Sequence, residues 1–137
     1  MTPTVTLGAA GLILFLLGLL NGFVIPVSRS PRIGLSAHLT GVQSGTFLIA
    51  VGLFWPQMHL AAAWSGILAH ATWISLYAVW FSLLLAGLWG AGRGLPIAGQ
   101  GITTTPAKQA VVTLLLAGGS LGILVAIGAM LAGWALA

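Results

Sequence analysis

The sequence contains no aspartate, no glutamate and no cysteine, and only 3% of its 137 residues are charged. A soluble domain carries roughly 25% charged residues, so this chain lacks the side chains that cover a water-facing surface. Without cysteine there are no disulfides, thiolate metal sites or cysteine nucleophiles. Without carboxylates the usual acid–base pairs are missing, and so is the membrane-embedded acidic residue on which proton-coupled pumps and small multidrug transporters depend.

Apolar residues are abundant and make up 59% of the chain. A helix that spans the hydrocarbon core of a bilayer needs about 20 mostly apolar residues. Four segments meet this requirement, at about residues 5–25, 35–55, 61–89 and 110–136. The first lacks the basic residues that precede the apolar part of a secretory signal, so it is expected to stay in the membrane. We therefore predict an all-α integral membrane four-helix bundle, with one transmembrane domain over residues 1–137.

The four permanent positive charges predict the orientation of the chain in the membrane. Arg29 and Arg32 lie in the first predicted loop, Arg93 and Lys108 lie in the third, and the second loop has neither arginine nor lysine. Because positively charged loops stay in the cytoplasm, both termini are expected on the opposite side of what we take to be a bacterial inner membrane. These charges are too few and too scattered to follow a nucleic-acid backbone, which excludes a nucleic-acid partner.

Small residues at helical spacing predict close contacts between helices. The glycine pairs with this spacing are Gly18 and Gly22, Gly41 and Gly45, and Gly118 and Gly122. Such pairs let backbones approach closely, which favours helix association when the solvent is lipid.

His38 lies in the first turn of the predicted second helix, on one helical stripe with Gly41 and Gly45. An imidazole beside bare backbone suits a flat macrocycle, which needs an axial ligand and room for its ring. Arg29 and Arg32 in the preceding loop can pair with anionic propionates at the membrane surface. The alternative is a histidine that hydrogen-bonds near a helix end, with the glycines serving helix packing. The spacing alone leaves both interpretations open.

A second stripe at helical spacing lies on the predicted third helix and consists of His70, Trp73, Tyr77 and Trp80. It indicates either the wall of a substrate pocket with an imidazole and a phenol as polar groups, or the packing of bulky side chains. A zinc site built from the three histidines is not expected, because His38 and His59 belong to opposite ends of the second helix.

Several blocks of the sequence are typical of one family. They are Gly22-Phe-Val-Ile-Pro26, the run from Ser30 to Gly45, Gly52-Leu-Phe-Trp55-Pro56, Tyr77, Trp89-Gly-Ala-Gly92 and Pro96-Ile-Ala98. With these blocks the chain resembles hydroxylaminobenzene mutase and, more distantly, styrene oxide isomerase.

The resemblance implies a homotrimer that holds haem b, with His38 as the axial ligand and the ferric iron acting as a Lewis acid on the substrate oxygen. The implied reactions are the rearrangement of N-phenylhydroxylamine to 2-aminophenol or of an aryl epoxide to an aldehyde, and both are redox-neutral. The chain departs from the family pattern at Ser44 and Val79, where asparagines are expected. Gln43 or Ser44 is expected to supply a substitute hydrogen bond, and Tyr77 is expected to donate a hydrogen bond or a proton.

The sequence therefore favours a haem-dependent membrane isomerase acting on small aromatic substrates. Its apolar walls, formed by the stripe from His70 to Trp80, would hold the substrate ring. The alternative is a non-enzymatic four-helix haem protein or an accessory membrane subunit. A second axial ligand would distinguish the two, because a six-coordinate haem leaves no place for a substrate.

Overall fold

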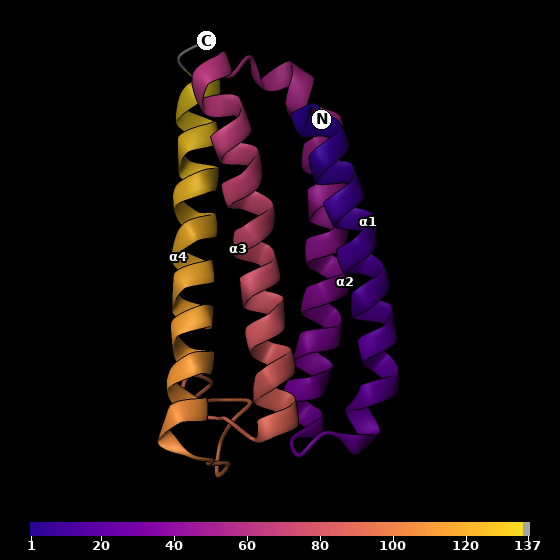
Figure 1. Cartoon of the computed structure of the whole chain (residues 1–137), viewed down its shortest axis with the longest axis vertical. Helices are drawn as coiled ribbons and strands as arrows, with labels where there is room; N and C mark the ends of the chain where they lie inside the picture. The colour runs from indigo at the N-terminus through magenta and orange to yellow at the C-terminus, as the bar shows by residue number, and fades with distance from the viewer. Residues whose placement is uncertain (136–137) are drawn as a thin grey trace.

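The structure, a computed structural model, describes residues 1–135, and its regular elements over that range are all helices (Figure 1). Its long helices are α1 (Pro3–Asn21), α2 (Pro31–Phe54), α3 (Ala62–Trp89) and α4 (Pro106–Ala135). Two short 3-10 helices, η1 (Gly22–Val27) and η2 (Trp55–Met58), continue α1 and α2. All four long helices are apolar and long enough to cross a membrane, which confirms the predicted all-α fold.

Two helices begin earlier than expected. Helix α2 begins at Pro31 instead of residue 35, and α4 begins at Pro106 instead of residue 110. Proline is tolerated in the first turn of a helix because the N–H that it lacks would have no partner there. These two prolines, which we assigned to loops, are therefore the first residues of helices. The Ser30 Oγ accepts a hydrogen bond from Ile33 N at 3.4 Å and caps α2. The expected end of the fourth helix at Leu136 lies outside the described residues.

The earlier start of α2 corrects the position of His38. With Pro31 as the first helical residue, His38 lies about two turns inside the helix and not in its first turn. This places the imidazole about 10 Å further along the helix axis than the start of α2.

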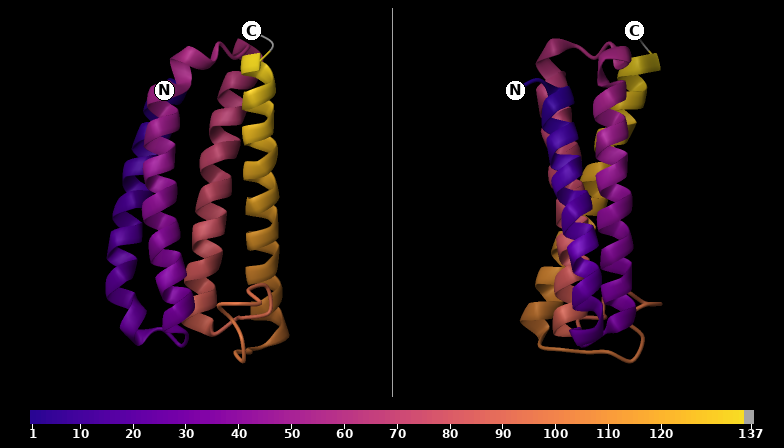
Figure 2. Two further views of the ribbon diagram at one scale, coloured as in Figure 1. Left: turned by 180° about the vertical axis from the view of Figure 1, so that it is seen from behind. Right: turned by 90° about the vertical axis from the view of Figure 1, so that its right-hand side faces the viewer.

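The helices pack as two hairpins, and they form an open bundle instead of a closed one (Figures 1 and 2). Helix α1 lies along α2, and α3 packs against both of them. Helix α4 packs along α3 and contacts η2, but over the described residues it forms no comparable contact with α1 or α2. One side of the molecule, between α2 and α4, is therefore left open.

The first and third loops lie at one end of the molecule, and the start of α1 and the end of α4 lie at the other (Figure 1). Two basic side chains at this end, one from the first loop and one from the start of α4, contact Trp89. The Arg29 Nη1 donates a hydrogen bond to Trp89 O at 3.3 Å, and the Lys108 Nζ lies 5.5 Å from the centroid of the Trp89 ring. The clustering of positive charge at one end agrees with the predicted topology, and the side of the membrane that this end faces stays a prediction.

Glycines bring α1 and α2 into backbone contact. A Cβ atom at Gly41 would lie 2.6 Å from Gly18 Cα, and one at Gly45 would lie 2.5 Å from Phe15 N. Both distances are too short for any side chain, so the predicted role of these glycines in helix packing is confirmed.

On α4 the contact glycine differs from the one that we predicted. Gly119 packs against α3, because a Cβ atom at this position would lie 2.7 Å from Ser75 O. A Cβ atom at Gly118 would meet nothing within 4 Å. Gly122 does face α3, where a Cβ would collide with the Ser75 hydroxyl. The contact face of α4 therefore contains Gly119 and Gly122 instead of Gly118 and Gly122.

Candidate functional site

The imidazole of His38 is half-buried and anchored to α1. Its Nδ1 lies 2.8 Å from Gly18 O. A carbonyl oxygen only accepts hydrogen bonds, so Nδ1 must carry the proton and donate it. In the neutral ring this leaves the Nε2 lone pair free, which is the form in which histidine binds a metal. A Cβ at Gly22 would lie 3.3 Å from the same Nδ1, so the bare backbone at Gly22 leaves room for the ring.

The glycine stripe beside His38 does not form an open surface within one chain. Gly41 is covered by Gly18 and Trp80, and Gly45 is covered by Phe15. The space that we expected a macrocycle to occupy is therefore filled by α1 and an indole ring. The glycines act on the histidine indirectly. They allow α1 to approach α2 closely, and this approach brings Gly18 O within hydrogen-bonding distance of His38 Nδ1.

Members of the aromatic stripe on α3 contact the first hairpin, Tyr77 against α1 and Trp80 against α2. The Tyr77 hydroxyl donates a hydrogen bond to Ala10 O at 2.8 Å, and its ring meets that of Trp73 edge to face at 5.5 Å. Trp80 is buried, with 7% of its surface exposed, and lies against Gly41. The indole N–H groups of Trp73 and Trp80 are buried, and neither has a hydrogen-bond partner among residues 1–135.

The fourth member of this stripe, His70, lies apart from the others. It is exposed, and its Nδ1 lies 2.8 Å from Gly66 O in the preceding turn of α3. Trp80 borders a groove of about 180 Å³ between α1 and α3 that Asn21 also lines.

Gln43 and Ser44 lie on α2 but not beside His38. At about 100° per residue, Gln43 is turned about 140° and Ser44 about 120° from His38 around the helix. Gln43 is exposed, and Ser44 is buried with 8% of its surface accessible. Arg29 and Arg32 are both exposed at the basic end. The expected site residues are thus distributed over different faces of a single chain.

The helix register separates His38 from His70. Gly34 packs on Gly87 and Gly41 packs on Trp80, which places His38 level with residue 83 of α3. His70 is then about 20 Å away along the helix axis, at about 1.5 Å per residue. His59 ends η2 with a left-handed backbone (φ 48°) at the other end of the molecule. The three histidines therefore lie apart, and no three metal-ligating side chains cluster in the described part of the chain.

Two buried amides were not assigned a role by the sequence analysis. Asn21 is 4% exposed, and its Nδ2 donates a hydrogen bond to Gly34 O at 3.4 Å. Gln109 is also 4% exposed, and its Oε1 accepts from Arg93 N at 3.0 Å. The sequence signal for both amides is a polar residue at the end of an apolar segment. Such a residue is a candidate for a structural hydrogen bond, because a buried amide requires a partner.

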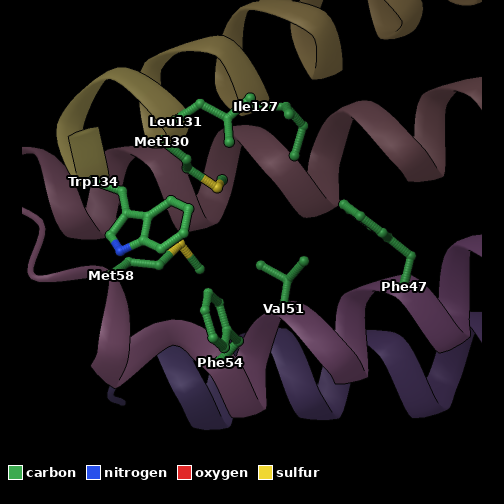
Figure 3. Close-up of a pocket in the computed structure, with 8 residues that line it drawn as sticks. All are labelled: Phe47, Val51, Phe54, Met58, Ile127, Met130, Leu131 and Trp134. Atoms are coloured by element: carbon green, nitrogen blue, oxygen red, sulfur yellow. The ribbon is translucent and has the colours of Figure 1, made fainter.

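The open side of the bundle forms an apolar groove of about 180 Å³ (Figure 3). Its walls are three residues of α2, Met58 of η2 and four residues of α4. Phe54 and Trp134 face each other across it with their ring centroids 6.3 Å apart. The groove begins at Phe47, more than two turns beyond His38, so it does not belong to the histidine site.

Four helices that are long and apolar enough to cross a membrane, one of them carrying a histidine anchored to its neighbour, define a small helical membrane protein. The family described as styrene oxide isomerase matches residues 5–135, and the chain belongs to this family. The fold and the family together make it a membrane isomerase.

Two relatives are similar over most of the chain, and both come from Ectopseudomonas oleovorans. Hydroxylaminobenzene mutase HabB is 48% identical over 120 residues, which cover 84% of this chain and 71% of that protein. Hydroxylaminobenzene mutase HabA is 47% identical over 109 residues, which cover 79% of this chain and 81% of that protein. No solved structure matches the chain.

Proposed function

We propose that the chain rearranges small aromatic substrates with a haem b held by His38. The proposed reaction is the conversion of N-phenylhydroxylamine to 2-aminophenol, as the names of both mutase relatives suggest. In this reaction the N–O bond breaks, a C–O bond forms at the ortho carbon, and the proton of that carbon moves to nitrogen. Substrate and product are isomers, so neither an oxidant nor a reductant is consumed. The family description supports an aryl epoxide as a second substrate.

The observation that carries this proposal is the hydrogen bond between His38 Nδ1 and Gly18 O. It holds the ring in one orientation and leaves the Nε2 lone pair, which would hold the haem iron, as a backbone carbonyl does for many metal-binding histidines. When bound, ferric haem supplies a Lewis acid to a chain that has no acidic side chain of its own. Arg29 and Arg32, exposed at the same end of α2, would pair with its propionates.

The aromatic residues of α3 would hold the substrate ring and stabilise positive charge that develops in the transition state. Indole and phenol faces attract cations, and Trp73, Tyr77 and Trp80 supply such faces in a low-dielectric region. His70 is exposed on the same helix and lies about 20 Å from His38 along the helix axis, so within one chain it would be too far away to contact a small substrate held at His38. The Tyr77 hydroxyl donates to Ala10 O, so it must leave this acceptor before it can donate to a substrate.

We propose that the functional unit is a homotrimer in a bacterial inner membrane, with the basic end in the cytoplasm. The space over Gly41 and Gly45 is filled by α1 and Trp80, so a macrocycle on His38 has to be enclosed partly by a neighbouring copy. The same copy would bring Gln43 toward the site, because Gln43 is exposed and in one chain faces away from His38, whereas Ser44 is buried within its own chain.

One assay tests the reaction and the oxidation state together. The purified ferric protein is incubated without oxygen or reductant, first with N-phenylhydroxylamine and then with an aryl epoxide, and the products are identified by mass and retention. We expect a Soret band in the protein and 2-aminophenol or the aldehyde as product. Colourless protein at full purity, or activity that needs oxygen or a reductant, would contradict the proposal.

A further inference from the structure

Asn21, the last residue of α1, is a buried polar side chain to which the proposed function gives no role. It is 4% exposed, and its Nδ2 donates a hydrogen bond to Gly34 O of α2 at 3.4 Å. Burying an amide costs free energy unless it is hydrogen-bonded, and lipid offers no partner. An asparagine at this place in an apolar span therefore indicates a role that an apolar side chain would not fill.

This bond is one of two that join α1 and α2 side by side in opposite directions. Asn21 donates from α1 to Gly34 O, and His38 donates from α2 to Gly18 O at 2.8 Å. On each helix the two residues are about one turn apart, so both bonds lie on the facing sides of the same pair. Sliding or rotation of α1 along α2 would break at least one of them.

The acceptor of Asn21 is held in place from two directions. Within α2, Gly34 O also accepts the backbone N–H of His38, four residues further along the helix. Gly34 packs against α3 as well, where a Cβ atom at Gly87 would lie 3.1 Å from Gly34 N. Asn21 thus fixes the end of α1 to the contact between α2 and α3.

The carbonyl that meets the imidazole is available because α1 ends at Asn21. In a continuing α-helix Gly18 O would accept the N–H of Gly22. The chain instead continues as the 3-10 helix η1, and the Gly22 N–H bonds to Leu19 O. Gly18 O is therefore released from its usual intrahelical partner and can accept from His38 Nδ1.

We propose that Asn21 is a positioning residue for His38. By fixing the end of α1 against α2, it keeps Gly18 O within hydrogen-bonding distance of Nδ1 and so holds the imidazole in the tautomer whose Nε2 is free. The inference rests on the proposed function for the role of that Nε2 as haem ligand. Asn21 would act through the imidazole, as hydrogen-bond partners of metal-binding histidines do, and not by contact with substrate.

The tautomer of His38 can be measured without haem, from the 15N NMR signals of the imidazole nitrogens in nanodiscs. Asn21→Leu removes the donor with a side chain of similar volume. In this variant the ratio of the Nδ1–H to the Nε2–H tautomer at His38 should fall about tenfold, the equivalent of one hydrogen bond. His70 is an internal reference, because its Nδ1 bonds to Gly66 O within α3 and its tautomer should not change.

Tyr77→Phe is the matched control, because it removes another interhelical hydrogen bond of α1, from the Tyr77 hydroxyl to Ala10 O. Ala10 lies about 12 Å from Gly18 along α1, so this variant should leave the His38 tautomer unchanged. Equal changes in both variants would overturn the proposal, since a general loosening of α1 would then explain them. An unchanged ratio in Asn21→Leu would overturn it too. If Asn21→Leu does not fold, Asn21→Ala decides by the same comparison.

Haem binding distinguishes this inference from the proposed function. Asn21→Leu should bind haem about 10–100-fold more weakly, the usual effect of losing support for a metal ligand, measured by transfer to a haem-free acceptor protein. An unchanged affinity would overturn the role of Asn21, while haem in the unaltered protein would still support the proposed function. If the unaltered protein binds no haem, the proposed function is wrong, whereas a changed tautomer in Asn21→Leu would still show that Asn21 positions His38.

Discussion

Replacement of Gly45 by alanine should destabilise the chain by forcing α1 away from α2. The added Cβ would lie 2.5 Å from Phe15 N and 2.7 Å from Gly11 O, where ordinary contact begins at 3.4 Å. Both neighbours are backbone atoms, so no flexible side chain can move aside and α1 has to retreat by roughly 1 Å. Overpacking of this kind costs about 1–3 kcal/mol of the free energy of unfolding.

Gly66→Ala is the matched control, because a Cβ at this position in α3 would meet nothing within 4 Å. The gain in helix propensity, up to about 1 kcal/mol, is shared by both substitutions and cancels in their comparison. Unfolding in mixed detergent micelles, followed by the fluorescence of the six tryptophans, measures the free energy of each variant.

The outcome also decides what the glycine stripe does. If Gly45 serves helix packing, Gly45→Ala lowers the stability of haem-free protein relative to Gly66→Ala. If both variants unfold with the same free energy and Gly45→Ala only loses haem, the glycine lines a cofactor and our interpretation of the α1–α2 contact is refuted.

The remaining predictions concern the proposed site. His38→Ala should lose stoichiometric haem, measured by absorbance and metal content, while His70→Ala retains it; full haem in His38→Ala would disprove axial ligation. Tyr77→Phe should keep haem, lose about 1 kcal/mol of stability with the bond to Ala10 O, and slow turnover roughly 100-fold if the phenol is a general acid. An unchanged rate would leave Tyr77 a purely structural role. Mass measurement in mild detergent should find a trimer, and a haem-loaded monomer would count against it.

The composition and periodicity of the sequence were sufficient to predict several features. Four apolar segments separated by loops predict four spanning helices, because only a helix satisfies its own backbone hydrogen bonds in lipid. An even number of spans puts alternate loops together, and the structure brings Arg29 and Lys108 to the same Trp89. The absence of carboxylates and thiols left the histidines as candidate ligands, and ligation by His38 stays a prediction.

The starts of α2 and α4 were not predicted. A proline suggests a loop, although it is also a favourable first residue of a helix. Pro31 and Pro106 take this second role, and the choice depends on whether the preceding residue caps the helix. Ser30 does so for α2. His38 consequently lies deeper in its helix than we expected.

Which neighbour each helix face meets was decided by the tertiary structure alone. Periodicity places His38 and Gly41 on one face, but it does not show that this face meets Gly18 or that Tyr77 reaches Ala10. In a soluble protein the apolar face marks the interior. In a membrane the lipid is as apolar as the core, so hydrophobicity does not distinguish a packed face from a lipid-facing one, and only close packing and hydrogen bonds do.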